Sequence, residues 1–480
     1  MRGLALARAW VMGGGRCAFL SRCENPALRA RVADAGCAFW AAQSSDGAEL
    51  EEAKAKAKEG AWLVVDGYHF DAEYLKGARA LGFRVLTVDD FGHRASLPAD
   101  IILNQNLGAE RRDYAGEPGT LQLLGTRYAL LRPEFLELGR RPREFPKRAR
   151  RLLVTLGGSD PDNVTMTVVE ALAQIKEPVE TLVVLGAENR HEDALRAAAA
   201  ARPEISFARN VDDMPRRMIE ADAAVTAGGT TCWEAAYLGL PSLVLVLADN
   251  QREVAGELDK AGAAYLLGEG RQAAAEAVAR ALDSLLGDAE RRRALSRAGQ
   301  ALVDGLGARR VAGVLRAAAG GALTEKDVTL RLAAEADAFE IWRLANQPSV
   351  RRHSFARDPI ALPTHLKWFP GQLKDPRVRF WVLEVGGAVA AQIRYAVVES
   401  GTAEVHFSVH QAFRGKGLAT QALLRTRQES CRSLGVARLR GVVIEPNEPS
   451  ARAFLKAGYR RVAELKKSGL DCAVFEAPCS

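Results

Sequence analysis

The side chains and backbone groups best suited to bind a ligand lie in the stretch 221–251. In this stretch a glycine turn joins a short apolar run to a segment long enough to form a helix. This stretch reads ADAAVTAGGTTCWEAAYLGLPSLVLVLADNQ. Backbone N–H groups at the start of a helix carry partial positive charge and lack partners within the helix, so a glycine turn there can hold a diphosphate. Glu234 lies one helical turn further on, where a carboxylate can accept hydrogen bonds from ribose hydroxyls. An ordinary strand-to-helix turn of an α/β protein is the alternative interpretation.

A second glycine turn reads GGSDPDN at residues 157–163 and separates the apolar run 152–156 from a helix. Glycine permits close approach of the backbone to a ligand, and Ser, Asp and Asn supply capping and ligand groups. The two turns together predict a nucleotide site in a cleft between α/β domains. Its predicted residues are Gly158, Ser159, Gly228, Gly229, Thr230, Thr231, Glu234 and Gln251.

Polar residues also follow several apolar runs of the first 110 residues. Asp66 and Tyr68 follow the run AWLVV, and Asp89 and Asp90 follow the run 83–88. Ligands of open α/β sheets lie outside the carboxyl ends of the strands, which makes Tyr68 a predicted sugar contact. A loop aromatic that caps the core is the alternative for Tyr68.

A third candidate site reads QAFRGKGLA at residues 411–419 and opens a long helix to about residue 434. Successive backbone N–H groups, with glycines that let a ligand approach, form a cradle for pyrophosphate at a helix start. Arg414 and Lys416 add positive charge. A solvated basic loop is the alternative.

The elements that position these residues alternate between strands and helices, which indicates α/β architecture throughout. The chain opens with a helix before its first strand, whereas a doubly wound domain normally opens with a strand. Residues 140–151 are rich in Arg and Pro and read as a linker, and a new pattern begins near residue 324. We predict two Rossmann-like domains at residues 1–145 and 146–322, followed by a third α/β domain at residues 323–480.

Composition narrows the class of protein. The 480 residues are 48% hydrophobic and 26% charged, which fits three folded domains rather than a disordered chain. Although the net charge is +7, the arginines are spread along the chain, so small anions rather than nucleic acid are the expected partners. No apolar run reaches the roughly 18 residues of a membrane span. The seven cysteines form no zinc spacing, and we expect reduced thiols in a cytoplasmic protein that needs no metal.

The first 320 residues resemble a known family through GGSDPDN, GTRYALLRPEF at residues 125–135, AGGTTCWEAAYLGLP and DNQ. These motifs resemble the UDP-sugar hydrolase of pseudaminic acid biosynthesis, which is itself similar to a cell-wall N-acetylglucosaminyltransferase with the two-Rossmann GT-B fold. The resemblance implies attack of water at the anomeric carbon of a UDP-linked 2,4-diacetamido-2,4,6-trideoxy sugar. It also implies that residues 228–231 hold the diphosphate, Glu234 the ribose, and the catalytic-site residues Tyr68 and Asn250 the sugar.

The same family has a catalytic histidine in a Gly-His-x-x-Arg motif whose arginine matches Arg2. The printed sequence starts one residue before that arginine, and His69 and His93 occur in other loops. Because positioned general bases commonly contribute about a hundred- to ten-thousand-fold to a rate, their absence would matter. We therefore expect a strand and a Gly-His pair encoded upstream; the alternative is a domain that binds UDP-sugar without efficient turnover.

The last 155 residues resemble the GCN5-related N-acetyltransferase (GNAT) family through the order strand, RGxGxA turn, helix, strand and NxxSxxxFxxxGY. The resemblance implies acetyl-CoA as co-substrate and an acceptor pocket near residues 346–369, where Trp368 and Phe369 could equally be core. The residues implied to bind acetyl-CoA are Val409, Arg414, Gly415, Lys416, Gly417, Leu418, Ala419 and Asn447.

Many members of the GNAT family have a tyrosine at the position of Phe454. That tyrosine is the acid that reprotonates the thiolate of CoA. Phenylalanine cannot donate a proton, so Glu404, His406 and Tyr459 are the candidate catalytic groups. For His406 a surface position on its strand is the alternative. The leading hypothesis joins an acetyltransferase acting on a UDP-amino sugar to a hydrolase that releases UDP. The alternatives are an acetyltransferase with a UDP-sugar-binding module and a GT-B glycosyltransferase; the oligomeric state is left open.

Overall fold

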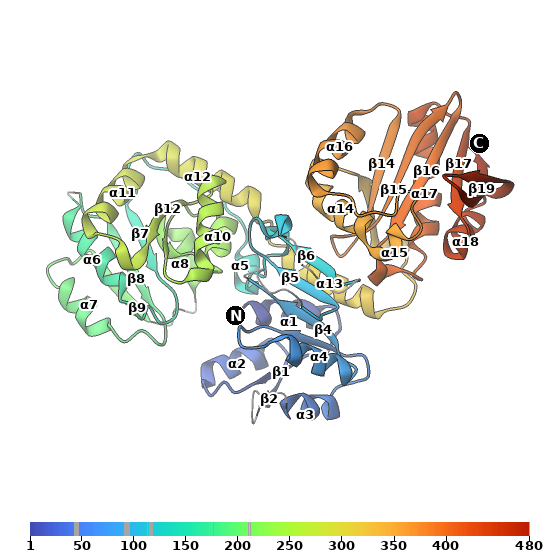
Figure 1. Ribbon diagram of the computed structural model, residues 1–480. Coiled ribbons are helices and arrows are strands. Elements are labelled where there is room, and N and C mark those ends of the chain that lie inside the picture. Colours follow the sequence, from blue (N-terminus) through green and yellow to red (C-terminus); the bar gives the residue numbers. More distant parts are fainter. Residues whose placement is uncertain are drawn as a thin grey trace.

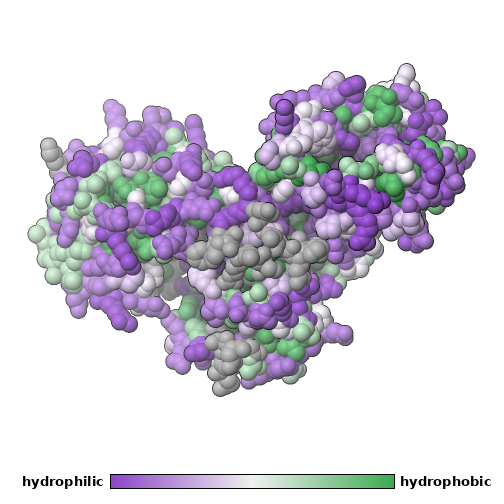
Figure 2. Space-filling view, viewed as in Figure 1, coloured by the Kyte–Doolittle hydropathy of each residue, from purple (hydrophilic) through white to green (hydrophobic). Residues whose placement is uncertain are grey.

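The computed structural model describes residues 1–42, 48–90, 97–112, 114, 119–175, 177–209, 211 and 213–479, and His93 lies outside these ranges. The chain forms three α/β lobes, with the first domain between the second domain and the C-terminal domain (Figure 1). Hydrophilic residues dominate the face seen in Figure 2, and smaller hydrophobic areas appear on each lobe. The described strands and helices agree with the predicted α/β class in all three lobes.

The first domain begins with a helix, as the sequence predicted, and its parallel strands form two separate sheets. One sheet pairs β1 with β2, and the other has the order β3-β4-β5-β6. The elements are α1 (Arg2–Met12), β1 (Ala18–Ser21), α2 (Pro26–Asp34), β2 (Ala38–Ala41), α3 (Ala48–Lys56), β3 (Trp62–Val65), α4 (Ala72–Ala80), β4 (Arg84–Val88), β5 (Ile101–Asn104), β6 (Leu121–Leu124) and α5 (Pro133–Leu138).

The second domain is a parallel six-stranded sheet of order β12-β11-β10-β7-β8-β9. Its interior strands β10 and β11 are buried at every position, as expected for strands covered on both faces by helices. The elements are β7 (Arg151–Thr155), α6 (Val164–Gln174), β8 (Glu180–Leu185), α7 (Glu192–Ala198), β9 (Ile205–Arg209), α8 (Met214–Glu220), β10 (Ala223–Ala227), α9 (Thr231–Leu238), β11 (Ser242–Val246), α10 (Asp249–Lys260), β12 (Tyr265–Glu269), α11 (Ala275–Gly287) and α12 (Ala289–Leu302).

Helix α13 (Gly307–Ala319) follows the helices of the second domain and packs against α1 of the first. It also contacts β14 of the C-terminal domain. Its buried face, which includes Val311, Val314 and Leu315, belongs to one apolar core that continues from β4 and β5 into the C-terminal sheet. The C-terminal domain therefore shares a core with the first domain.

The C-terminal domain is built on a seven-stranded sheet of order β13-β14-β15-β16-β17-β19-β18, in which β16 and β17 are the parallel pair. The remaining pairs are antiparallel, as the predicted meander requires. The elements are β13 (Val328–Leu332), α14 (Ala338–Asn346), α15 (Pro348–Arg351), α16 (Leu362–Lys374), β14 (Val378–Val385), β15 (Ala388–Glu399), β16 (Thr402–Val409), α17 (Leu418–Leu434), β17 (Arg438–Ile444), α18 (Glu448–Lys456), β18 (Arg460–Lys467) and β19 (Leu470–Pro478).

Polar contacts fix the first domain to the C-terminal domain. Arg127 donates to a carboxylate oxygen of Glu384 at 3.0 Å and to the carbonyl of Gly387 at 2.5 Å. The Arg343 guanidinium on α14 donates in the opposite direction, to the carbonyls of Glu110 and Arg112. Helix α14, which lines a cavity described below, is thus anchored on the first domain.

Candidate functional sites

The two glycine turns of the second domain emerge at the same edge of its sheet. From β7 the chain first adds strands on one side of the sheet, β8 and β9, and then crosses to the other side to add β10, β11 and β12. Thr155 at the end of β7 lies in register with Thr226 of the neighbouring β10. Residues 157–163 follow β7, and residues 228–231 follow β10. This change of side is the topological switch point at which open α/β sheets form a ligand crevice.

The turn after β10 is tightly packed at one glycine and open at the next. A Cβ atom on Gly228 would lie 3.0 Å from the Cβ of Gln251, whereas one on Gly229 or Gly158 would meet nothing within 4 Å. Thr230 is exposed, and the half-buried Thr231 begins α9. The N–H groups at the start of α9 thus border open space, which suits the predicted diphosphate site.

Ser159 and Gln251, which are also predicted to bind the nucleotide, lie in different surroundings. Ser159 is half-buried beside the exposed Gly158. The side-chain oxygen of Gln251 accepts a hydrogen bond from the N–H of Leu247 at 3.0 Å and so stabilises the loop after β11. Gln251 therefore has a structural contact that the sequence did not predict.

Glu234 is buried and forms a bidentate ion pair with Arg132. The Nε and Nη2 atoms of Arg132 donate to the two carboxylate oxygens at 2.7 and 3.1 Å. Burial raises the pKa of Glu234, and the Arg132 charge opposes that rise. Each carboxylate oxygen has a further lone pair, so the pair remains able to accept a ribose hydroxyl. Sequence analysis missed Arg132, although it lies within the quoted motif GTRYALLRPEF.

The predicted sugar contacts Tyr68 and Asn250 come from different domains and meet across the cleft. Asn250 donates to the Tyr68 hydroxyl at 3.0 Å, and that hydroxyl donates to Asp90 at 2.9 Å. Tyr68 is 55% exposed, which rules out the alternative that it caps the core. Arg2 binds both Asp66 and Asp90, with closest distances of 2.7 Å. The structure therefore gathers the polar residues that follow β3 and β4 beside the start of α10.

A cavity of about 770 Å³ lies in the C-terminal domain where β16 and β17 separate. These strands pair only at Thr402, Ala403 and Glu404, and the pyrophosphate-type turn follows β16. Gly415 and Gly417 have positive φ angles of 74° and 85°, and a Cβ atom on either would meet nothing within 4 Å. The predicted cofactor residues that line the cavity are Val409, Arg414, Gly415, Gly417, Leu418, Ala419 and Asn447.

Lys416 departs from the predicted set. Its ammonium group donates to the carbonyl of Gly320, in the segment that leads into the C-terminal domain, and its side chain does not line the cavity. The turn presents Arg414 to the cavity instead. A lysine between two glycines can point either way, and the sequence does not decide which.

His406 lines the cavity and is held by a charged pair behind it. Its Nε2 atom lies 3.2 Å from a carboxylate oxygen of Glu404, and Lys467 lies 3.2 Å from the same oxygen. Burial, with the charge of Arg394, lowers the pKa of His406 below its ordinary value, and Glu404 only partly offsets this. His406 is therefore a neutral imidazole at neutral pH, in contact with the cavity.

Tyr459 is buried outside the cavity. Its ring packs edge-on against Phe454 with centroids 5.0 Å apart, and its hydroxyl has no hydrogen-bond partner among the described residues. Phe454 does line the cavity and also contacts Phe407 and Phe475. This placement gives Tyr459 no route to a thiolate in the cavity, so it does not support the predicted catalytic role.

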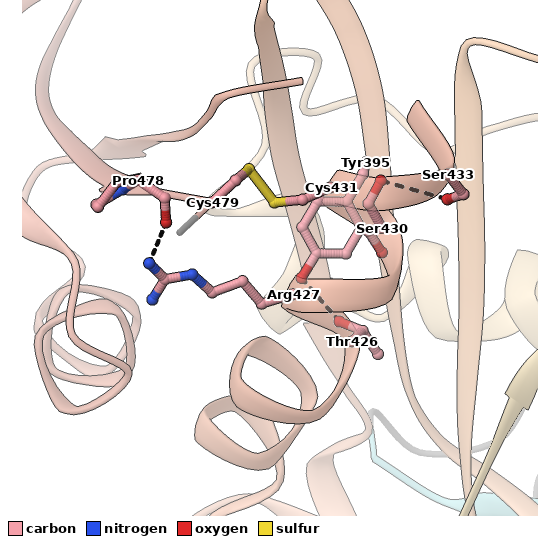
Figure 3. Close-up of a disulfide and its surroundings, with 8 residues drawn as sticks. All are labelled: Tyr395, Thr426, Arg427, Ser430, Cys431, Ser433, Pro478 and Cys479. Carbon is pink, nitrogen blue, oxygen red and sulfur yellow. Dashed lines mark hydrogen bonds between the residues drawn. A yellow bond between two sulfur atoms is a disulfide. The ribbon is translucent and has the colours of Figure 1, made fainter. Parts of the chain in front are cut away.

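The prediction of reduced thiols is wrong for two cysteines. Cys431, near the end of α17, and Cys479, after β19, form a disulfide (Figure 3). Arg427, one turn earlier on α17, donates to the carbonyl of Pro478 beside it. The two cysteines are 48 positions apart in the sequence, and no local pattern indicates this pairing.

Within the residues that the structure describes, no group of three His, Cys, Asp or Glu side chains is arranged to hold a metal ion. No helix in the same ranges is long and apolar enough to cross a membrane.

Two family models match separate parts of the chain. Residues 152–306 match the glycosyltransferase family 28 C-terminal domain, and residues 327–460 match the acetyltransferase (GNAT) domain. The chain thus joins a glycosyltransferase-like region of GT-B type to an acetyltransferase domain, as the fold and the cavity indicate. The specific hydrolase identity that the motifs implied is not part of either match.

Two curated relatives each match part of the chain. The spore coat polysaccharide biosynthesis protein SpsG of Bacillus subtilis is 28% identical over 270 residues, which are 56% of this chain and 79% of that protein. An uncharacterized protein of Methanocaldococcus jannaschii is 30% identical over 199 residues, which are 40% of this chain and 41% of that protein. The chain therefore spans less than half of the archaeal relative.

Solved acetyltransferases match about a third of the chain. An N-acetyltransferase from Staphylococcus aureus Mu50 is 22% identical, with a TM-score of 0.30 and coverage of 32% of this chain and 99% of that one. A spermidine N-acetyltransferase from Vibrio cholerae, in complex with CoA and spermine, is 16% identical, with a TM-score of 0.30 and coverage of 32% and 96%.

Proposed function

We propose that the C-terminal domain transfers an acetyl group from acetyl-CoA to the amine of a UDP-linked amino sugar, and that the first two domains bind that nucleotide sugar. The single observation that carries the proposal is the cavity between β16 and β17, with the N–H groups of Arg414–Ala419 at its edge. These groups suit the pyrophosphate of CoA. Asn447 would lie near the pantetheine arm.

The residues on the cavity wall supply a route for the proton. The acceptor nitrogen attacks the thioester carbonyl carbon, the carbon–sulfur bond breaks, and the thiolate leaves with the electron pair. Neutral His406 can take the proton that the amine loses, because its low pKa keeps a lone pair free at neutral pH. Glu404 orients the imidazole and stabilises the imidazolium that forms, while Lys467 holds the Glu404 carboxylate in place and its own charge opposes protonation of His406.

For the first two domains we propose UDP-sugar binding with release of UDP by attack of water at the anomeric carbon. The cluster of Tyr68, Asp90 and Asn250 favours this function, because it brings hydroxyl and carboxylate groups of the first domain together with an amide of the second. Arg132 and Glu234 would contact the nucleoside. UDP-sugar binding without turnover and glycosyl transfer to an acceptor are the competing outcomes.

A UDP-release assay separates these outcomes. The purified full chain is incubated with a UDP-linked 2,4-diacetamido-2,4,6-trideoxy sugar, and UDP is measured with and without added sugar acceptors. We expect UDP without any acceptor. UDP only in the presence of an acceptor would establish glycosyl transfer, and binding without UDP release would establish a binding module.

A further inference from the structure

The cavity of the C-terminal domain has a second end that acetyl-CoA recognition does not explain. Helices α14 and α16 and strands β14 and β15 supply this wall, which includes Ile341, His365, Phe380 and Gln392. It lies on elements other than the turn at residues 414–419. This wall is the part of the cavity left for the acceptor.

Two of its side chains carry buried polar atoms without partners. The Nε2 atom of His365 and the Oε1 atom of Gln392 have no hydrogen-bond partner among the described residues, and the hydroxyl of Ser349 on the same cavity is also unpaired. His365 is only 2% exposed. Buried polar groups are nearly always paired, so unpaired ones that share a cavity indicate a ligand.

The hydrogen-bonding state of His365 follows from its surroundings. Its ring donates to the backbone of Ala338, and since Nε2 is unpaired, that donor is Nδ1. Burial lowers the pKa of His365, so the ring is neutral and Nε2 presents a lone pair. The ring is stacked on Phe369 at a centroid distance of 5.4 Å, and Phe369 contacts Phe380, which fixes its orientation.

Gln392 is fixed by its strand neighbours. Its amide nitrogen donates to the hydroxyl of Ser408, its register partner on β16, at 3.3 Å, and leaves Oε1 without a donor. Arg394, two residues along on the same face of β15, also lines the cavity and stacks over Trp368. The wall therefore offers two oriented acceptor atoms between aromatic rings.

We propose that His365 and Gln392 form the acceptor subsite of the acetyltransferase, in which His365 Nε2 and Gln392 Oε1 receive hydrogen bonds from hydroxyl or N–H groups of the acetyl acceptor. Two acceptor atoms without their own donors select a ligand rich in donors, such as a sugar that carries an amine beside hydroxyl groups. An amine on a bare hydrocarbon ring would leave both atoms unpaired, at a cost in affinity. This inference rests on the proposed acetyl transfer and specifies its substrate class.

The test compares two acceptors and three variants of the full chain. The acceptors are a UDP-linked 4-amino sugar and cyclohexylamine, which presents an amine on a six-membered ring without hydroxyls. The variants are His365→Phe, which keeps a stacked ring, Gln392→Met, and the control Thr402→Val, which removes another unpaired buried hydroxyl outside the cavity. CoA release gives kcat and KM for both substrates.

We expect His365→Phe and Gln392→Met each to raise the KM for the amino sugar about tenfold, while the KM for acetyl-CoA stays within twofold. His365→Asn, which restores an acceptor atom, should recover part of the loss. Thr402→Val should match the wild type, and cyclohexylamine should not distinguish wild type from His365→Phe. A change of KM for the amino sugar but not for cyclohexylamine is specific to the acceptor. A purely structural role of the two residues would not produce such a difference.

Two results would overturn separate parts of the account. If the wild type acetylates the amino sugar and both cavity variants keep its KM, the subsite is wrong while the proposed function stands. If the wild type releases no CoA with either amine, the proposed acetyl transfer fails, and the subsite fails with it. A similar loss for both acceptors and for acetyl-CoA would show a folding defect in place of a subsite.

Discussion

The cleft between the first two domains is bridged by ion pairs and hydrogen bonds, whereas the acetyltransferase cavity lies within one domain and is shaped by a sheet. Across the cleft, Arg132 binds Glu234 and Asn250 binds Tyr68, so each domain contributes half of every contact. In the cavity, the separation of β16 from β17 opens the site, and all of the described lining residues belong to the C-terminal domain. The cleft should therefore be sensitive to changes that loosen the domains, and the cavity to changes at its own turn.

The largest effect is expected at the turn of the cavity. Gly417→Glu would place a carboxylate in the open space at the start of α17, where the pyrophosphate of CoA is proposed to bind. Like charges at this distance cost several kcal/mol, so acetyl-CoA affinity should fall roughly 100-fold or more, measured by calorimetry.

The matched control for this change is Gly401→Glu. Gly401 also has a positive φ angle of 75° and open space around it, but it lies in the turn between β15 and β16, away from the cavity. Both variants carry the same charge and backbone strain. Equal losses of acetyl-CoA affinity would place the cradle elsewhere.

A large effect on folding stability, as distinct from ligand affinity, is expected in the cleft. Arg132→Ala leaves the buried Glu234 carboxylate without its partner, and breaking such a pair typically costs about 3–5 kcal/mol. The free energy of unfolding from a denaturant titration measures this loss. Arg216→Ala, in an exposed pair with Glu220, should cost only about 0.3–0.5 kcal/mol. Comparable losses of unfolding free energy for the two variants would mean that the interdomain ion pair stabilises the protein no more than an exposed one.

A smaller effect is expected from the hydroxyl that joins the two halves of the cleft. Tyr68→Phe removes the link between Asp90 and Asn250, and UDP-sugar turnover should fall about tenfold for a hydrogen bond of this kind. Acetyl-CoA binding should be unchanged. Tyr74→Phe, whose hydroxyl bonds Glu49 away from the cleft, is the control. Unchanged turnover for Tyr68→Phe would remove Tyr68 from the site.

The smallest effect is a displaced pH profile for acetyl transfer. Burial lowers the pKa of His406, so the neutral imidazole persists as pH falls below its ordinary range near 6.5 and is lost only as pH falls through the lowered pKa. The acid limb of kcat should therefore lie below pH 6.5, and His406→Gln should remove it. An acid limb unaffected by His406→Gln would assign the titration to another group.

The sequence predicted the local features well because their causes are local. Glycine turns, such as the one at Gly417, are set by the few residues around them, and alternating apolar runs mark strands wherever they occur. The α/β class, the antiparallel meander of the last domain and the glycine turn at the cavity followed from these patterns. Tyr68 and Asn250 could be named, but only the fold brings them together.

The features that sequence missed depend on contacts between distant segments. Arg132 meets Glu234 across 102 residues, and Cys431 meets Cys479 across 48. The direction of Lys416 depends on the carbonyl of Gly320, and the return of α13 to the first domain depends on which apolar face it covers. No local propensity encodes these choices, because they are decided when the domains pack.

The central claim is that the acetyl acceptor is an amine on a nucleotide-linked sugar. The most direct measurement incubates the full chain with acetyl-CoA and a UDP-linked 4-amino sugar and identifies the products by mass spectrometry. We predict an N-acetylated sugar formed in step with CoA. Release of CoA with the amine unchanged, or no release while acetyl-CoA remains bound, would contradict the claim.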